Sequence, residues 1–126
     1  MDAVLRERLR AFKEMPFVPN EAVELVRSEL EDLDVEGVLG DDQAGFFISH
    51  MINAIVRLMQ GDLSVTAPDP EVLRVVEDAD PGARKRADLF EKKVQGRLGV
   101  SFPEAELNFI VMHFATLRNH LAKELR

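Results

Sequence analysis

Apolar residues recur along the start of the chain at intervals of three and four, the spacing that gathers side chains on one face of a helix. The two stripes are Leu5, Leu9 and Phe12, and then Ala22, Val23, Val26, Leu30 and Leu33. Pro16 and Pro19 separate them, because proline cannot continue a helix. Asn20 can cap the second helix with its side-chain oxygen. The pattern therefore predicts two amphipathic helices at the start of the chain.

An acidic segment interrupts the pattern next. Gly37 and Gly40 lie within it and indicate a connection between helices. Asp41 or Asp42 can then cap a helix that stops near Gly61.

Two aspartate-proline steps organise the second half of the chain. They are Asp69-Pro70 and Asp80-Pro81. Each offers an N-cap followed by proline at the first helical position, which predicts helices over 70–79 and 81–98. Gly99 ends the second of these. Ser101 and Glu104 have the spacing of a capping box, which would open a last helix that runs to about residue 122.

No segment alternates apolar and polar residues over the length of a strand, so we predict an all-α fold, a compact bundle of about five helices. A chain of 126 residues is the size of one domain, and 46% of its residues are hydrophobic and can supply a core. We expect an N-terminal helical segment over residues 1–19 and a helical domain over residues 20–126, within a single domain overall.

Composition narrows the class of function. The net charge of −7 argues against direct binding of nucleic acid, which relies on a surplus of Lys and Arg. Basic residues between positions 84 and 97 spread around their predicted helix, which indicates a solvated face, with docking of an acidic protein as the alternative. No apolar run approaches the roughly 20 residues that cross a bilayer, and the chain has no cysteine. We therefore expect a cytoplasmic protein without a membrane segment.

A histidine and an arginine share one side of the predicted third helix. The core arc of this helix is Phe47, Ile48, Met51, Ile52, Ala54, Ile55, Leu58 and Met59. His50, Asn53 and Arg57 fall outside that arc. Seven residues bring a helix back to within roughly 20° of the same direction. We therefore expect His50 and Arg57 to lie one above the other, beside the core.

The last predicted helix has a similar arrangement. Its core stripe is Leu107, Ile110, Val111, Phe114, Leu117 and Leu121. Glu106, His113 and His120 form a row along one flank. Phe109 and Met112 also lie outside the stripe, which indicates contact with another helix or another subunit. His120 is left out of the candidate site, because a histidine near a helix C-terminus is favoured by the helix dipole alone.

The histidines permit more than one chemistry. A neutral imidazole is a nucleophile near physiological pH, so a helical histidine can accept a phosphoryl group that a nearby arginine would hold. A metal would need ligands from both helices, with His50, Glu106 and His113 as the candidates, because a spacing of seven residues rises roughly 10.5 Å. No phosphate loop or hydrolase serine motif occurs. We predict no catalytic residue, cofactor or metal, and the spacing alone also fits two polar residues on a half-exposed face.

Two stretches of the sequence, taken together, carry a family resemblance. They are HMINAIVR at 50–57 and FPEAELNFIVMHF at 102–114. The first has an arginine seven residues after a histidine, and the second has a Pro-x-x-Glu step, Pro103 to Glu106, with His113 seven residues after the glutamate. Both segments, with their order and separation, resemble the signature segments of the phosphotransferase-system regulation domain, PRD for short. The resemblance covers roughly residues 20–120.

The resemblance implies a PRD-like helical domain that forms a homodimer in a bacterial cytoplasm. His50, and after it His113, would accept phosphate from the histidine phosphocarrier protein or from a sugar-specific phosphotransferase component. Arg57, Glu106 and Asn53 would stabilise the phosphate or the partner. With one such domain and no nucleic-acid-binding module, the chain would regulate transcription through another protein, in the manner of antiterminator-like regulators.

Three alternatives remain open. The bundle can be a dimerisation or interaction module without phosphorylation, in which His50 and His113 are packed, hydrogen-bonded residues. The phosphotransfer bundle of two-component signalling has the same size and helical class, but the lysine and glycine that usually follow its histidine are missing from HMINA. A metal-dependent helical enzyme is the third. Ser49, where relatives often carry an acidic residue, is a departure from the PRD pattern.

Overall fold

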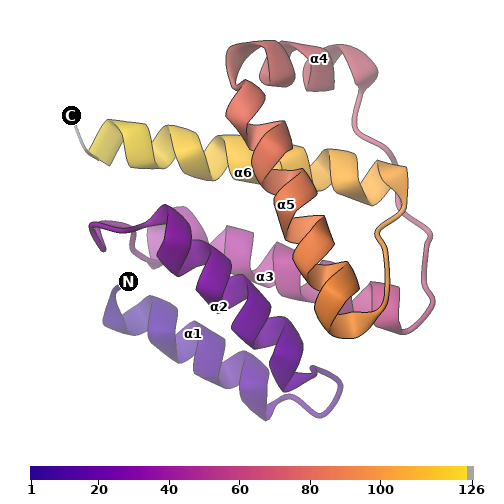
Figure 1. Ribbon diagram of the computed structural model, residues 1–126. Coiled ribbons are helices and arrows are strands. Elements are labelled where there is room, and N and C mark those ends of the chain that lie inside the picture. Colours follow the sequence, from indigo (N-terminus) through magenta and orange to yellow (C-terminus); the bar gives the residue numbers. More distant parts are fainter. Residues whose placement is uncertain (125–126) are drawn as a thin grey trace.

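The computed structural model describes residues 1–124, which form six α-helices and no strand (Figure 1). The helices are α1 (Ala3–Glu14), α2 (Asn20–Leu33), α3 (Asp41–Met59), α4 (Pro70–Ala79), α5 (Pro81–Leu98) and α6 (Glu104–Glu124). The predicted all-α class is confirmed. The helix count is six instead of about five, because α4 and α5 are two separate helices with the predicted bounds. Residues 125–126, the end of the predicted helical domain, lie outside the described part of the chain.

Two helices hold the arrangement together. The helix α3 packs against α1, α2 and α6, and α5 packs against α2, α4 and α6. In Figure 1, α1, α2 and α3 lie alongside one another, α5 crosses α6, and α4 sits over the first turns of α5. No helix among residues 1–124 has the length and apolar character needed to cross a membrane.

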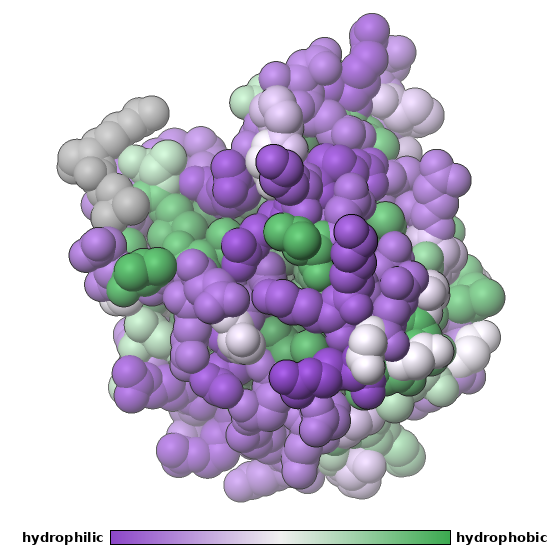
Figure 2. All heavy atoms as spheres, viewed as in Figure 1, coloured by the Kyte–Doolittle hydropathy of each residue, from purple (hydrophilic) through white to green (hydrophobic). Residues whose placement is uncertain are grey.

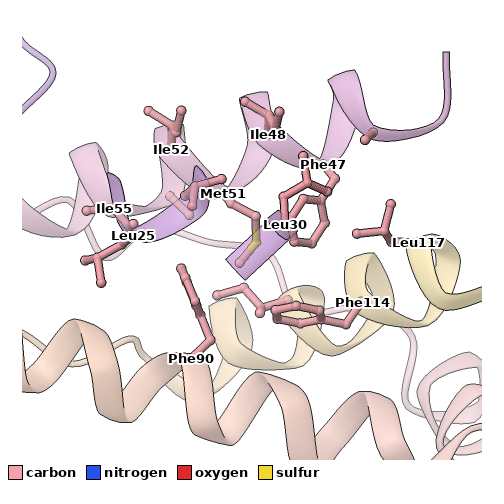
Figure 3. Packing of buried hydrophobic residues seen from close by; sticks show 14 of the residues in the cluster. Leu25, Leu30, Phe47, Ile48, Met51, Ile52, Ile55, Phe90, Phe114 and Leu117 are labelled. Atoms are coloured by element: carbon pink, nitrogen blue, oxygen red, sulfur yellow. The ribbon is translucent and has the colours of Figure 1, made fainter. Parts of the chain in front are cut away.

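Aromatic rings join the central helices (Figure 3). The ring of Phe114 on α6 meets Phe47 of α3 edge-on with centroids 5.2 Å apart, and meets Phe90 of α5 with centroids 6.1 Å apart. Edge-to-face contacts of this kind add about 1 kcal/mol to the free energy of burial. The predicted core arc of α3 is buried except for Met59, which is 43% exposed in the last turn of the helix.

Local signals place several helix ends correctly. The carboxylate of Asp69 accepts hydrogen bonds from the backbone N–H groups of Glu71 and Val72, so it caps α4 as predicted. Gly99 ends α5 with φ at 69°, a left-handed conformation that glycine adopts without strain.

Other predicted caps are wrong by one residue. Pro19 precedes α2 and Asn20 is its first residue. Gly40 precedes α3, and Asp41 is the first residue of that helix. The physical reason at α3 is competition, because the carboxylate of Asp41 accepts from Arg8 Nε at 2.6 Å and Nη2 at 2.9 Å, which ties α3 to α1 instead.

Distant partners also take the remaining capping groups. The hydroxyl of Ser101 accepts from Gln95 Nε2 at 2.7 Å and does not cap α6, which begins at Glu104. Asp80 stands at the N-cap of α5, but its carboxylate accepts from Arg118 Nε at 2.8 Å. Asp80 therefore joins the start of α5 to α6.

A buried carboxylate joins α2 to α5. Glu29 is 1% exposed, and its two oxygens accept from Arg86 Nε at 2.7 Å and Lys93 Nζ at 3.0 Å. Both cations belong to the basic run of α5, which the sequence indicated as a solvated face. That prediction is wrong for Arg86, whose side chain is 25% exposed, whereas Lys93 is 45% exposed and stays solvated while it binds the same carboxylate.

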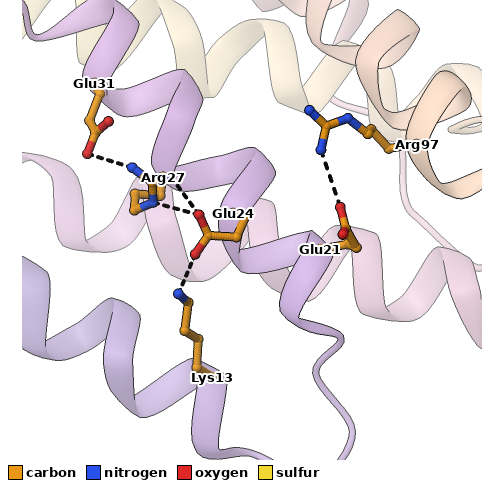
Figure 4. Close-up of polar contacts among 6 residues, drawn as sticks. All are labelled: Lys13, Glu21, Glu24, Arg27, Glu31 and Arg97. Atoms are coloured by element: carbon orange, nitrogen blue, oxygen red, sulfur yellow. Dashed lines mark hydrogen bonds and ion pairs between the residues drawn. The ribbon is translucent and has the colours of Figure 1, made fainter.

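The exposed side of α2 carries a different kind of ion pair (Figure 4). Glu24 binds both Lys13 of α1 and Arg27, and Arg27 also reaches Glu31. All of these side chains are at least one-third exposed. Figure 2 shows the same face as mostly hydrophilic, with apolar residues in small separate groups. Water screens such pairs, so they contribute little to stability.

Substitution of the two types of carboxylate should separate their contributions. Glu29→Ala leaves Arg86 and Lys93 with only the exposed carboxylate of Asp32, at 3.9 and 3.6 Å, and we expect the free energy of unfolding in urea to fall by about 2 to 3 kcal/mol. The matched control is Glu21→Ala, which removes an exposed pair between the same two helices, with Arg97 Nη1 at 3.4 Å (Figure 4). This control should change stability by less than about 0.5 kcal/mol. Equal losses in the two variants would contradict the assignment.

Candidate functional site

The packing of α3 on α6 brings two histidines together. The ring centroids of His50 on α3 and His113 on α6 are 4.7 Å apart, with the ring planes tilted by 44°. His50 is exposed, whereas His113 is half-buried. The sequence placed each histidine on the flank of its own helix. Their contact depends on how the two helices cross, which helical periodicity does not determine.

Phe46 covers both imidazoles. Its ring centroid lies 4.0 Å from that of His50 and 5.9 Å from that of His113, and the side chain is 66% exposed. Sequence reasoning missed this residue. The signal was its position four residues before His50, because residues four apart on a helix are neighbours on its surface. Such a large exposed aromatic is informative when it stacks on polar rings.

An ion pair lies two turns of helix further along the same contact. Arg57 Nη2 of α3 donates to Glu106 Oε1 of α6 at 2.6 Å. Glu106 is 6% exposed, so its carboxylate needs the guanidinium as a neutralising partner. The sequence placed these residues as separate flanking groups, and in the structure they bind each other.

These side chains line one groove of about 460 Å³. The connection between α3 and α4 supplies the opposite rim, through Ser64, Val65 and Thr66. Two hydroxyl groups thus face the same groove as the imidazoles, and helical periodicity could not reveal residues on a loop. Phe109 also lines the groove, whereas Met112 does not, and the contact expected for this second apolar side stays a prediction.

Two residues of the expected row and flank lie elsewhere. Asn53 is exposed on α3 and is not among the residues that line the groove. Its stabilising role stays a prediction. His120 is half-buried on α6, two turns beyond His113, and does not line the groove either.

Burial keeps His113 neutral. Loss of hydration, and after it the positive charge that His50 can carry, together lower the pKa of His113 from 6.5 to about 4. A neutral imidazole keeps one nitrogen with a free lone pair, the form required of a nucleophile. At neutral pH the half-buried histidine is therefore in its reactive form.

The groove combines the parts of a phosphoryl acceptor. It has imidazole nitrogens as nucleophiles, a guanidinium whose geometry suits phosphate oxygens, and hydroxyl donors on the rim. The described residues contain no group of three or more His, Asp or Glu side chains placed to hold a metal ion. Glu106, a ligand of the metal site considered from the sequence, is bound to Arg57.

Comparison with known proteins gives one finding. A family model described as "PRD domain" matches residues 29–117, more than half of the chain. The matched segment includes α3 and every residue of α6 that lines the groove. Neither the curated proteins nor the solved structures give a match.

The lowered pKa of His113 makes stability depend on pH in a defined direction. Between its ordinary pKa of 6.5 and the folded value of about 4, the unfolded chain binds a proton at His113 and the folded chain does not. Stability is therefore complete above about pH 6.5 and is lost as the pH falls. Urea unfolding at pH 7 and pH 5 should show a loss of about 1 to 2 kcal/mol that His113→Asn lacks.

The control for this measurement is His120→Asn, which removes another half-buried histidine of the same helix outside the groove. It should keep the loss seen in the unchanged protein. Carboxylates that titrate near pH 5 are common to all three chains, so the differences between chains isolate the histidine. An identical loss in the unchanged chain and in His113→Asn would show that the ring of His113 is not held neutral by burial.

Proposed function

Because the chain belongs to the PRD family, the regulation domains of the sugar phosphotransferase system, we propose that it is a phosphorylation-controlled regulator. His50 is the first acceptor and His113 the second, and the donor is the histidine phosphocarrier protein or a sugar-specific component of that system. The observation that carries the proposal is the groove itself, which both imidazoles and Arg57 line together. His50 comes first because it is exposed and a protein donor can approach it.

The transfer needs only groups that the groove contains. A lone pair on a neutral nitrogen of His50 attacks the phosphorus atom, and a new N–P bond forms. The bond from phosphorus to the donor's histidine breaks, and that nitrogen keeps the electron pair. The ring of His50 loses its N–H proton as the donor's ring regains one. Guanidinium and hydroxyl donors stabilise the charge on the transferred group, which is the main requirement of phosphoryl transfer.

Phosphorylation would change the ion pair beneath the histidines. The added group brings close to two negative charges, which attract Arg57 and repel the carboxylate of Glu106. Since Arg57 Nη2 already binds Glu106 Oε1, the two acceptors compete for one guanidinium. Glu106 is on α6 and Arg57 is on α3, so the competition acts on the packing of these helices. A shift of 1 to 3 kcal/mol, roughly the usual range of coupling energies, is enough to change which packing dominates.

The output of this switch passes to another protein. We propose a cytoplasmic homodimer whose packing reports sugar supply to a transcription regulator or antiterminator. Asn53, which is exposed on α3 three residues after His50, would contact the donor or the partner in this proposal.

A second candidate function is an interaction module without phosphorylation. The ion pair of Arg57 with Glu106 favours it, because this pair satisfies the groove's charges without any ligand. In that case the histidines are structural, and partner binding is independent of the phosphate donor.

The two functions differ in a direct labelling experiment. The purified chain is incubated with labelled phosphoenolpyruvate, the first enzyme of the phosphotransferase system and the phosphocarrier protein. We expect a label that is stable in alkali and lost in acid, as phosphohistidine is, and His50→Asn should reduce the labelling rate at least tenfold. His120→Asn is the matched control and should label at the rate of the unchanged chain.

The labelled variants must also be shown to be folded, by circular dichroism and by urea unfolding. A folded chain that takes up no label on His50 or His113, from the phosphocarrier or from a sugar-specific component, would overturn the proposed function in favour of the interaction module.

A further inference from the structure

We infer that His50 and His113 form a single acceptor that carries at most one phosphoryl group at a time, so that modification of either histidine prevents modification of the other. This inference rests on the proposed function and specifies how the same site is controlled. A chain with two independent acceptors has four states, whereas a shared acceptor lacks the doubly modified state and has three.

The distance between the rings supports this inference first. Their centroids are 4.7 Å apart, and Phe46 lies against both rings, at 4.0 Å from His50 and 5.9 Å from His113. Two phosphoryl groups on these rings would both lie at one groove, at a separation comparable to the roughly 8 Å over which physiological salt screens charges. Each group carries close to two negative charges. Their repulsion is therefore only partly screened.

The second support for this inference is the small number of cationic side chains in the groove. Among the described residues that line the groove, Arg57 is the single arginine or lysine, and Glu106 already binds it. One phosphoryl group can compete for this guanidinium. A second would face a neighbouring phosphoryl group and a buried carboxylate without a cation of its own, which is an unfavourable place for charge.

The hydroxyl groups on the rim do not change this balance. Ser64 and Thr66 can donate to phosphate oxygens, but they carry no charge, and the hydroxyl of Ser64 donates to Asp62. Burial keeps the imidazole of His113 neutral, so this ring does not supply the positive charge that a second phosphoryl group would need. The groove thus has the nucleophiles for two groups and the charge for one.

A small chemical donor tests the capacity of the groove without any protein donor. Phosphoramidate transfers its phosphoryl group to a histidine nitrogen: an N–P bond forms, the original P–N bond breaks, and ammonia leaves with the bonding electron pair and the proton that the imidazole loses. All chains in this experiment carry His120→Asn, so that His50 and His113 are the two histidines that remain of the three in the sequence. Intact mass spectrometry in alkaline solution then counts phosphoryl groups per folded chain.

The expected result is one phosphoryl group per chain at saturating donor when both histidines are present. The single variants His50→Asn and His113→Asn, in the same background, should also accept one group each. Chains with two groups as a major species would overturn the inference. A His50→Asn chain that accepts none would overturn it too, because burial of His113 would then explain the limit of one.

The same count after unfolding in urea is an internal control and should rise to two, because the rings are then separated. Failure of this inference is distinguishable from failure of the proposed function. Two groups from phosphoramidate, with normal labelling by the phosphocarrier, would overturn the shared acceptor alone. One group from phosphoramidate, with no label from any protein component, would overturn the proposed donor and support the shared acceptor.

Discussion

The edge-on contact between Phe47 and Phe114 sets the geometry on which the rest of the site depends. These rings fix how α3 lies on α6 from inside the core, and each has a site residue as its neighbour in sequence. Phe46 directly precedes Phe47, and His113 directly precedes Phe114. The buried contact of Phe47 with Phe114 therefore determines where Phe46 meets His113 at the surface. The positions of Phe46 and His113 in the groove therefore depend on packing in the core. The core tolerates little displacement, because protein interiors are close-packed.

The sequence was most informative where structure depends on neighbours along the chain. Asp69 and Pro70 mark the start of α4 because capping and proline geometry act within one turn of helix. His50 and Arg57 share a side of α3 because helical periodicity requires it. The same reasoning failed at Asp41, whose carboxylate binds Arg8 from a helix that is distant in sequence. A side chain that could cap a helix can bind a distant group instead, and local sequence reveals only the capping interaction.

The contacts that complete the site join different helices, and helical periodicity does not predict contacts of this kind. It predicted that Glu106 and Arg57 lie on the flanks of two helices, but not that a hydrogen bond of 2.6 Å joins them. Glu29, with its two cations on α5, is a second example. In both cases a nearly buried carboxylate on one helix finds its cation on another, which matters in a chain with a net charge of −7. One pair supports the scaffold, and the other lies in the groove, where a new anion can reach it.

Phe46 has a consequence for observing this protein in solution. Its ring lies over both imidazoles, and the circulating π electrons of an aromatic ring alter the local magnetic field at nearby protons. The imidazole C–H resonances of His50 and His113 should therefore be displaced from one another and from those of His120, although all three are the same kind of residue. With no tryptophan or tyrosine in the chain, the three histidines share the aromatic region of the NMR spectrum with the eight phenylalanines alone. The chemical shifts of these histidine protons therefore depend on the position of Phe46, and a movement of α3 against α6 would change them.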